Sequence, residues 1–378
     1  MRFSLPRFQS NTGAVGVSFD DDVVRLLQVR EQGGTLVVTG AAQREMDNES
    51  VDQERLATML RDAIVSGGFV GRRCIVSLPE RDVFLQSMQL PAMSDSELGE
   101  AVAWEASQRM GVARDAIRSD WIRTGADDVQ SAARSEVLAV AARNTVLSKK
   151  LEALMSAGLR PMAVDTEFGG ISRLFSRYHR RDADQGTGRA VLHVGEHAST
   201  MLVLRGESIA FCKRIEIGGR MFDESVAERL CLEPRAAGEL RLARVQHGAA
   251  DIDPATDRAL REAIRPVTTE LAHQVLLCLR YASVTFRGLT PQRLISTGTH
   301  GHEPGLLEAM QSTCGVPVHV DDAQGSLSDL QVGLTSALQR DIGFGGAWAA
   351  VAGLSLRGLH TRERTRRGSA ARPEKVVA

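Results

Sequence analysis

Acidic residues follow one β-rich segment, and a histidine stands near a glycine at the end of another. Asp20–Asp22 follow the segment Val15–Phe19, and His193 stands two residues before Gly195. Carboxylate oxygens are the ligands that Mg²⁺ prefers, and glycine lets backbone N–H groups approach a phosphate closely. The acidic triplet is therefore a candidate Mg²⁺ site that could recruit phosphate, whereas tight turns alone are enough to explain the glycines.

The sequence gives little support for a metal site or for other kinds of enzyme active site. His193 and His197 fall on a strand and its turn, while His300 and His302 flank a glycine without a third ligand nearby, so no metal site is predicted from either pair. The chain contains no G-x-S-x-G, G-x-x-x-x-G-K-[ST] or G-x-G-x-x-G sequence. We therefore expect neither a serine hydrolase nor a P-loop or dinucleotide-binding enzyme.

Length, composition and charge exclude further classes. The 378 residues are 43% hydrophobic and 25% charged, which is typical of a globular protein. The 46 basic and 47 acidic residues leave a net charge of −1, which argues against a nucleic-acid partner. No apolar run approaches the ~20 residues of a membrane span, and the five cysteines are scattered without C-x-x-C pairing. We expect a cytoplasmic protein.

Two stretches of the chain open with the same order of elements. Strand-like segments over 14–41 precede a helix with an apolar stripe from Leu56 to Ile64, and strand-like segments over 190–215 precede helices from Met221 onward. Between them, the strand-like segment Arg81–Leu90 is followed by a helix capped at Ser94. The predicted fold class is α/β: two lobes of duplicated structure with a cleft between them and an inserted small α+β subdomain.

These patterns divide the chain into six parts. The predicted parts are the first lobe (1–79), the inserted subdomain (80–160), the rest of the first lobe with a linker (161–188), the second lobe (189–342), the segment 343–359 and a disordered tail (360–378). From Arg357 to the end the chain has seven basic residues against two acidic ones. Such a tail either binds weakly to an anionic membrane surface or has no partner.

Several strings, in order along the chain, resemble the PilM family of type IV pilus assembly proteins, which have the actin-like (ribonuclease-H-like) fold of the division ATPase FtsA. The strings are Val15–Val29, Ser77–Pro79, Met88–Pro91, Ser94–Met110, Glu136–Asp165, Ala190–Gly219, Ile295–Gly305 and Ala352–Gly358. The resemblance extends over about residues 13–359, and it depends on the order and spacing of the strings rather than on any single one. It implies that the segment 343–359 is a closing helix of the first lobe.

The resemblance implies a nucleotide cleft, and this chain departs from the family there. Actin-like ATPases place an Asp in each phosphate turn, whereas this chain has Ser18 and His193 at those positions and Asp20 in place of a glycine. A carboxylate about 5 Å from a phosphate charge costs roughly 3 kcal/mol at an effective dielectric constant near 20. We therefore expect no catalytic residues, no ATPase activity and no cofactor, with Mg-ATP bound weakly at most. The vestigial nucleotide site would consist of Ser18, Asp20, His193, Gly195, Gly218, Gly219 and Gly298.

The resemblance also implies a partner. PilM-like proteins bind the cytoplasmic N-terminal peptide of the inner-membrane protein PilN in a groove between the first lobe and the inserted subdomain. Here we expect that groove to be lined by Val83, Leu85, Met88, Leu90 and Trp104. The predicted function is a non-catalytic assembly protein of a type IV pilus or type II secretion platform, peripheral to the inner membrane. An active actin-like ATPase or sugar-type kinase is the alternative, and self-association stays open.

Overall fold

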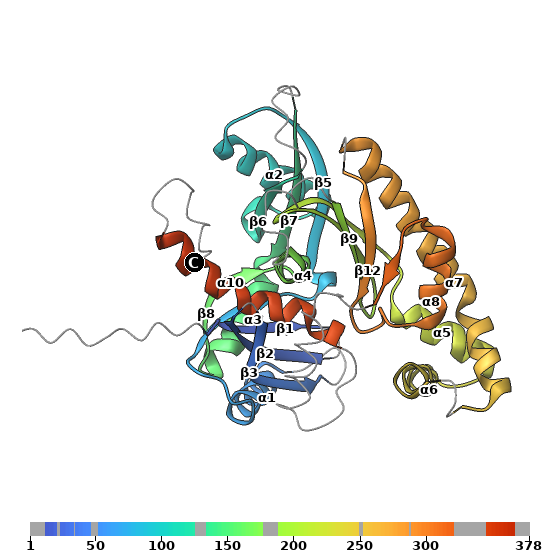
Figure 1. Ribbon diagram of the computed structural model, residues 1–378. Coiled ribbons are helices and arrows are strands. Elements are labelled where there is room, and N and C mark those ends of the chain that lie inside the picture. Colours follow the sequence, from blue (N-terminus) through green and yellow to red (C-terminus); the bar gives the residue numbers. More distant parts are fainter. Residues whose placement is uncertain are drawn as a thin grey trace, which may run out of the picture.

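The computed structural model describes residues 12–20, 23–33, 35–46, 52–124, 134–176, 188–248, 252–286, 289–320 and 345–366. Two lobes, each built on a five-stranded sheet, lie side by side, and a smaller subdomain with a three-stranded sheet extends from the first lobe (Figure 1). Among the helices of these residues, none combines the length and the apolar character that crossing a membrane requires.

The sheet of the first lobe has the strand order β3-β2-β1-β4-β8. Its strands are β1 (Val15–Phe19), β2 (Val23–Gln32), β3 (Thr35–Glu45), β4 (Arg73–Ser77) and β8 (Arg160–Asp165). β1 pairs antiparallel with β2 and parallel with β4. Helices α1 (Gln53–Ser66) and α3 (Asn144–Ser156) cover one face, where Leu60 and Leu154 belong to one core cluster with Val17.

The second lobe repeats this arrangement, with the strand order β11-β10-β9-β12-β13. Its strands are β9 (Gly188–Val194), β10 (Ser199–Arg205), β11 (Ser208–Ile215), β12 (Pro291–Thr297) and β13 (Val318–His319), and its helices are α5 (Gly219–Leu230), α6 (Pro234–His247), α7 (Pro254–Thr285) and α8 (Pro304–Thr313). β9 pairs antiparallel with β10 and parallel with β12, as β1 does with β2 and β4. The shared order confirms the predicted duplication.

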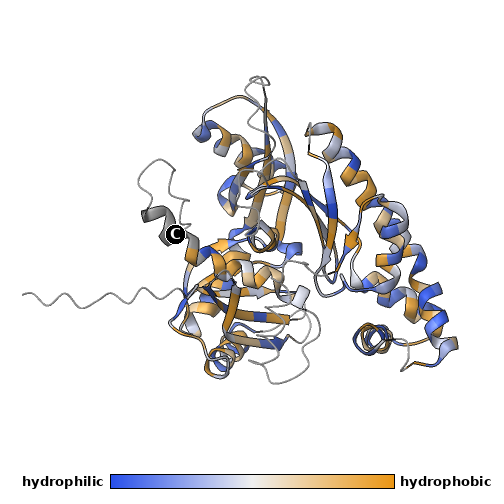
Figure 2. Cartoon of the chain, viewed as in Figure 1, coloured by the Kyte–Doolittle hydropathy of each residue, from blue (hydrophilic) through white to orange (hydrophobic). Residues whose placement is uncertain are grey.

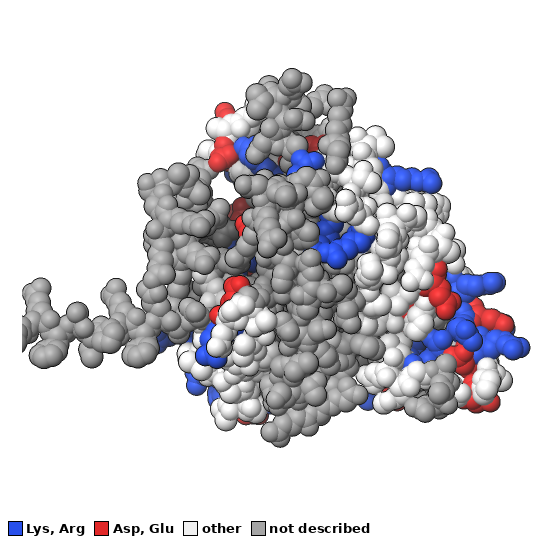
Figure 3. All heavy atoms as spheres, in the orientation of Figure 1, with Lys and Arg blue, Asp and Glu red and all other residues white. Residues whose placement is uncertain are grey.

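Mixed charges cover the outer helices of the second lobe. Figure 3 shows Lys and Arg intermingled with Asp and Glu over this part of the surface. Arg229 pairs with Glu262 at 2.9 Å, and Arg261 pairs with Asp257 at 2.7 Å. Interspersed charges of both signs give little long-range field, so this face is a solvated exterior.

A layer of two helices separates the two sheets. Helices α4 (Glu167–Ser176) and α10 (Ala349–Arg366) lie there, preceded by the short helix η5 (Gly345–Trp348). One core cluster contains Phe175 and Trp348 together with Leu27 of the first sheet and Val191 of the second, and Figure 2 shows the apolar character of this layer. The lobes therefore share a core.

Helix α10 begins within the predicted closing helix and packs against α4, β1 and β2 of the first lobe. It continues to Arg366, so the first residues of the tail that we expected to be disordered are helical. The rest of that tail and the predicted linker at 177–187 lie outside the described residues.

The subdomain combines a three-stranded sheet with one helix. Strands β5 (Val83–Pro91), β6 (Ile117–Arg123) and β7 (Arg134–Arg143) pair antiparallel in the order β5-β7-β6, and α2 (Asp95–Met110) covers one face. The predicted capping box is confirmed: the Ser94 hydroxyl accepts from the Glu97 N–H, and the Glu97 carboxylate accepts from the Ser94 N–H at 2.8 Å. Leu98 and Val102 of α2 are fully buried.

The structure ends the subdomain earlier than we predicted, at Arg143 instead of residue 160. Helix α3 packs against α1, and its Ala153 and Leu154 belong to the core of the first lobe. β8 extends the first sheet by pairing with β4. We assigned α3 and β8 to the subdomain because they follow its last strand in the chain. Their apolar side chains, however, pack in the core of the first lobe.

Candidate functional site

The cleft lies where the β1–β2 turn of the first lobe approaches the β9–β10 turn of the second. A cavity there is lined by Asp20, Glu80 and Glu167 from one side and by Gly195, Glu196 and His197 from the other. It leaves about 10 Å³ for the centres of water-sized spheres, which is about the space that one water molecule needs. The carboxyl ends of the parallel strands β4 and β8 lead into this cleft, as is usual for sites on α/β sheets.

At the first turn, polar side chains are held by hydrogen bonds and an ion pair with one another. The Ser18 hydroxyl donates to Oε1 of Glu167 at 3.0 Å and accepts from the Ser77 hydroxyl at 3.2 Å. Asp20 forms an ion pair with Arg25, which lies on the neighbouring strand. Asp21 and Asp22, the other members of the acidic triplet, lie outside the described residues.

On the other side of the cleft, His193 is the second-to-last residue of strand β9 and is 7% exposed. Burial lowers the pKa of His193 to about 4, so the imidazole is neutral at physiological pH. Its Nδ1 atom is buried without a hydrogen-bond partner among the described residues. Gly195 closes the turn by donating to the Ala198 carbonyl at 3.0 Å.

Three further predicted glycines gather behind this turn, and close packing explains each of them. A Cβ atom at Gly218 would lie 2.4 Å from the Glu196 carbonyl oxygen, and one at Gly219 would lie 2.2 Å from the His300 ring. Gly298 has a φ of +96°, and a Cβ atom there would lie about as close to the Val194 carbonyl oxygen. The structure thus brings the predicted residues together, and the glycines have structural reasons to be there.

His300 lies in the turn that follows strand β12. Its Nδ1 lies 2.8 Å from Nη2 of the buried Arg241, and its Nε2 lies 2.7 Å from Oε2 of Glu196. Because a guanidinium only donates, Nδ1 accepts, and the proton of this imidazole is on Nε2, from which it is donated to Glu196. Arg241 also pairs with Asp223 at 2.7 Å and with Glu303 at 3.0 Å. Protein side chains therefore fill this side of the cleft.

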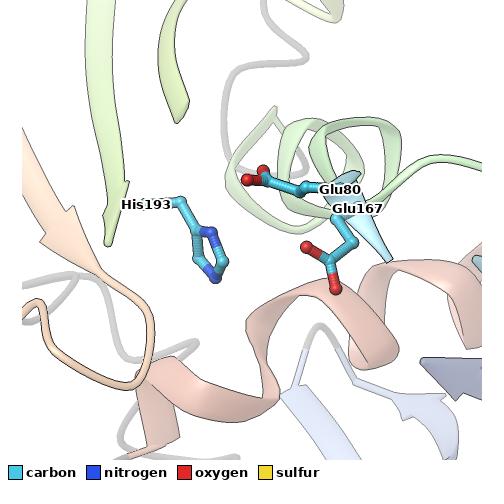
Figure 4. A group of neighbouring side chains, drawn as sticks. All are labelled: Glu80, Glu167 and His193. Atoms are coloured by element: carbon cyan, nitrogen blue, oxygen red, sulfur yellow. The ribbon is translucent and has the colours of Figure 1, made fainter. Parts of the chain in front are cut away.

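Sequence reasoning missed two carboxylates, Glu80 and Glu167. Together with His193 they present ligand-type atoms that lie within 4.8 Å of one another (Figure 4). Burial, together with the charges of Asp20 and Glu80, raises the pKa of Glu167 well above its ordinary value. Both residues closely follow the carboxyl ends of parallel strands, β4 and β8, and that position is the signal that could have found them.

The five residues predicted for the partner groove do not form one surface. Val83 and Leu85 are half-buried on the face of β5 opposite α2, whereas Met88 and Leu90 pack against α2 on the other face. Met88 is a core residue at 8% exposure. Trp104 is 57% exposed on the outer side of α2, since Leu98, Val102 and Ala106 face the sheet.

The comparisons identify the family. The family model described as "Type IV pilus assembly protein PilM" matches residues 16–358. A chain of a solved structure described as a PilM-PilN type IV pilus biogenesis complex is 22% identical, with a TM-score of 0.71 over 92% of this chain and 98% of that chain. The ethanolamine utilization protein EutJ from Carboxydothermus hydrogenoformans is 12% identical, with a TM-score of 0.52 over 91% of this chain and 89% of that chain. Comparison with curated proteins gave no match. The predicted actin-like fold is confirmed, and the chain belongs to the PilM family of type IV pilus assembly proteins.

Proposed function

We propose that this protein is a non-catalytic, cytoplasmic assembly factor that binds the N-terminal peptide of a PilN-like inner-membrane protein. It would thereby connect the membrane platform of a type IV pilus or type II secretion machine to cytoplasmic parts. The family assignment and the similarity to a chain from a PilM-PilN complex support this role. The observation that carries the peptide-binding part is an open edge and face on the subdomain sheet.

That open edge belongs to β6 rather than to β5. The outer side of β5 lies against β11 of the second lobe, and Figure 1 shows β6 on the opposite side of the subdomain. In the described part of the chain β6 pairs only with β7. An exposed edge strand offers main-chain hydrogen bonds to an extended peptide, so β6 is the better candidate for strand addition.

The face beside this edge is partly open and partly apolar, and Arg118 and Asp120 of β6 lie on it beside Ile122. Ile122 lies opposite Leu138 in the β6–β7 register, on the face that also carries Val140 and Leu85. Leu138 is fully buried in the inter-lobe core, whereas Ile122 is 37% exposed. A peptide paired with β6 could place alternate apolar side chains on this strip. Val83 and Leu85 of the predicted groove share the face, while Met88 and Leu90 do not.

The cleft supports the non-catalytic part of the proposal. The carboxylates of Asp20, Glu80 and Glu167 line the inter-lobe cavity, which is far smaller than the ~300 Å³ of typical ligand sites. Carboxylates at this position repel a triphosphate, and the neutral His193 cannot orient a metal-bound phosphate as a carboxylate does. The residues present therefore do not suit Mg-ATP.

The experiment is a titration with a synthetic peptide of the N-terminal cytoplasmic segment of a PilN-like protein. We expect saturable binding that Ile122→Asp weakens more than about tenfold, because a charge on the strip opposes burial of apolar side chains. Trp104→Ser, which changes an exposed aromatic residue on the outer side of α2, should leave binding unchanged. Loss of binding in Trp104→Ser but not in Ile122→Asp would place the partner on α2, and no binding to the wild type would contradict the proposal.

A further inference from the structure

The outer face of helix α7 changes from charged to apolar along its length. Its first half carries exposed charged residues such as Arg261 and Glu262. In its second half, Leu277, Tyr281 and Val284 are 42%, 48% and 80% exposed, and spacings of four and three residues place them on one face of the helix. Because the solvent face of a helix is ordinarily polar, an exposed apolar stripe of this kind indicates an interaction surface.

The second lobe supports this stripe and places basic side chains beside it. The Tyr281 ring packs against Phe211 of β11, with 5.4 Å between the ring centroids. Arg280 precedes Tyr281 in the helix. Lys213 follows two residues after Phe211, on the same side of the strand. Both basic side chains are exposed, and neither has an ion-pair partner among the described residues. Since no Asp or Glu occurs between residues 271 and 286, the stripe is an apolar surface with a basic rim.

Helix α2 of the subdomain has a face of the opposite charge around an exposed aromatic ring. Trp104 is on the outer side of this helix. Glu100 stands one turn before it on the same face and is exposed. The carboxylate of Glu105 pairs with Arg109 at 2.7 Å, whereas Glu100 has no ion-pair partner in the described part of the chain. This face therefore offers an apolar anchor and an unpaired acid.

The two faces complement each other in shape class and in charge. A tryptophan is among the residues that most often anchor a protein contact, and the stripe on α7 gives it apolar and aromatic surface to pack on. Glu100 would then lie near the basic rim, where opposite charges fix the register of a contact. Figure 1 shows α2 and α7 at opposite sides of the molecule. The two faces can therefore meet only between two copies of the chain.

We propose that copies of this chain associate through α2 of one copy and the second half of α7 of the next. Because the two faces differ and lie on opposite sides, the contact is head-to-tail, and each added copy leaves one face of each kind free. A contact between two single helices buries less area than a permanent interface, so association is weak and depends on concentration. The contact is beyond the proposed peptide site on β6 and independent of it.

The first test is sedimentation velocity of the full chain from about 1 µM to about 100 µM. We expect the weight-average mass to rise with concentration and to pass beyond that of a dimer. Trp104→Ser and Val284→Asp should each weaken association by about tenfold or more, because each removes apolar contact from one of the two faces. Val65→Asp is the matched control, since Val65 lies on α1 of the first lobe and is as exposed as Val284. It should associate as the wild type does.

The second test reverses the charges on the two faces. Glu100→Arg and Arg280→Glu should each be monomeric where the wild type associates, because like charges then meet at every contact. An equal mixture of these two variants should associate again, since each contact between unlike copies joins opposite charges. The proposal is overturned by a wild type that stays monomeric, by association that Trp104→Ser and Val284→Asp leave unchanged, or by a mixture that stays monomeric. Thermal unfolding shows that each variant is folded.

Discussion

Gly170 of α4 and Gly353 of α10 place the backbones of two helices in direct contact. A Cβ atom at residue 353 would lie 1.7 Å from the Gly170 carbonyl oxygen, and one at residue 170 would lie 2.3 Å from the Ala350 carbonyl oxygen. Only glycine on both sides permits this approach. The contact keeps the helical layer between the sheets thin, so both lobes bury apolar residues against it.

Replacing Gly353 by Ala should therefore be severely destabilising. We expect a loss of about 3 kcal/mol or more in the free energy of unfolding, since overpacking against backbone cannot be relieved by a rotamer change. Gly99→Ala in α2 is the matched control, because its Cβ would meet only Trp121 Nε1 at an ordinary 3.6 Å. The control should be stabilised by up to about 1 kcal/mol. Urea unfolding measures both, and equal effects would contradict the packing argument.

Removing the Arg241 guanidinium should lower the free energy of unfolding, because the buried carboxylates that it pairs with lose their partner. Arg241→Met leaves Glu303, which is fully buried, and Asp223 without this partner. Breaking a buried network in this way costs about 3–5 kcal/mol. On the same helix, Arg235 pairs with Glu239 in solvent, and Arg235→Ala should change the free energy of unfolding by less than about 1 kcal/mol. A small change in the free energy of unfolding of Arg241→Met would show that water takes over the lost hydrogen bonds to Asp223 and Glu303.

Asp257 should make the free energy of unfolding depend on pH in the acid range. The hydrogen bond from Arg244 leads in lowering the pKa of Asp257 below its ordinary 3.8, and the charges of Arg244 and Arg261 add to this. A carboxyl group with a lowered native pKa stabilises the fold above its unfolded pKa, and that contribution is lost as pH falls through the native value. The stability difference between the wild type and Asp257→Asn should therefore be full at pH 6 and shrink below about pH 4. Urea unfolding across this range tests the point, and a constant difference would assign the pH dependence to other groups.

We expect no ATP turnover above background and, at most, weak binding of Mg-ATP. The expectation depends on the sequence-based prediction that Ser18, Asp20 and His193 replace the groups that hold and activate the phosphates in actin-like ATPases. Phosphate release and calorimetry measure the two quantities. Turnover that disappears in Ser18→Ala would show an active enzyme and favour the ATPase or kinase alternative.

Membrane association should depend on the protein partner rather than on the basic tail. In cell fractionation, we expect the protein at the inner membrane only when the PilN-like partner is present, because a few basic residues bind anionic lipid weakly. Deleting residues 367–378 is the matched control, since it leaves α10 intact and should change little. Attachment that persists without the partner and is lost with this deletion would make the tail the anchor.

Local patterns determined most of the elements. Short β-rich segments separated by turn residues predicted the strands that open both lobes, and the Ser94–Glu97 pair predicted the start of α2. These signals are short-range, since strand composition, turns and helix capping depend on residues within a few positions of one another. The same reasoning could not assign α3 to a lobe, because its apolar stripe shows that a partner exists without saying which.

The sequence by itself determined the duplicated two-lobed fold, and it predicted departures from the ATPase pattern at Ser18, Asp20 and His193. Only the tertiary structure decided which side chains share the cleft, because Glu80, Glu167 and His193 are far apart along the chain and meet where parallel strands end. It also decided that Met88 is core and that, among the described residues, β6 rather than β5 has the open edge. An alternating strand specifies two faces but not what covers each of them, since burial depends on contacts between distant segments.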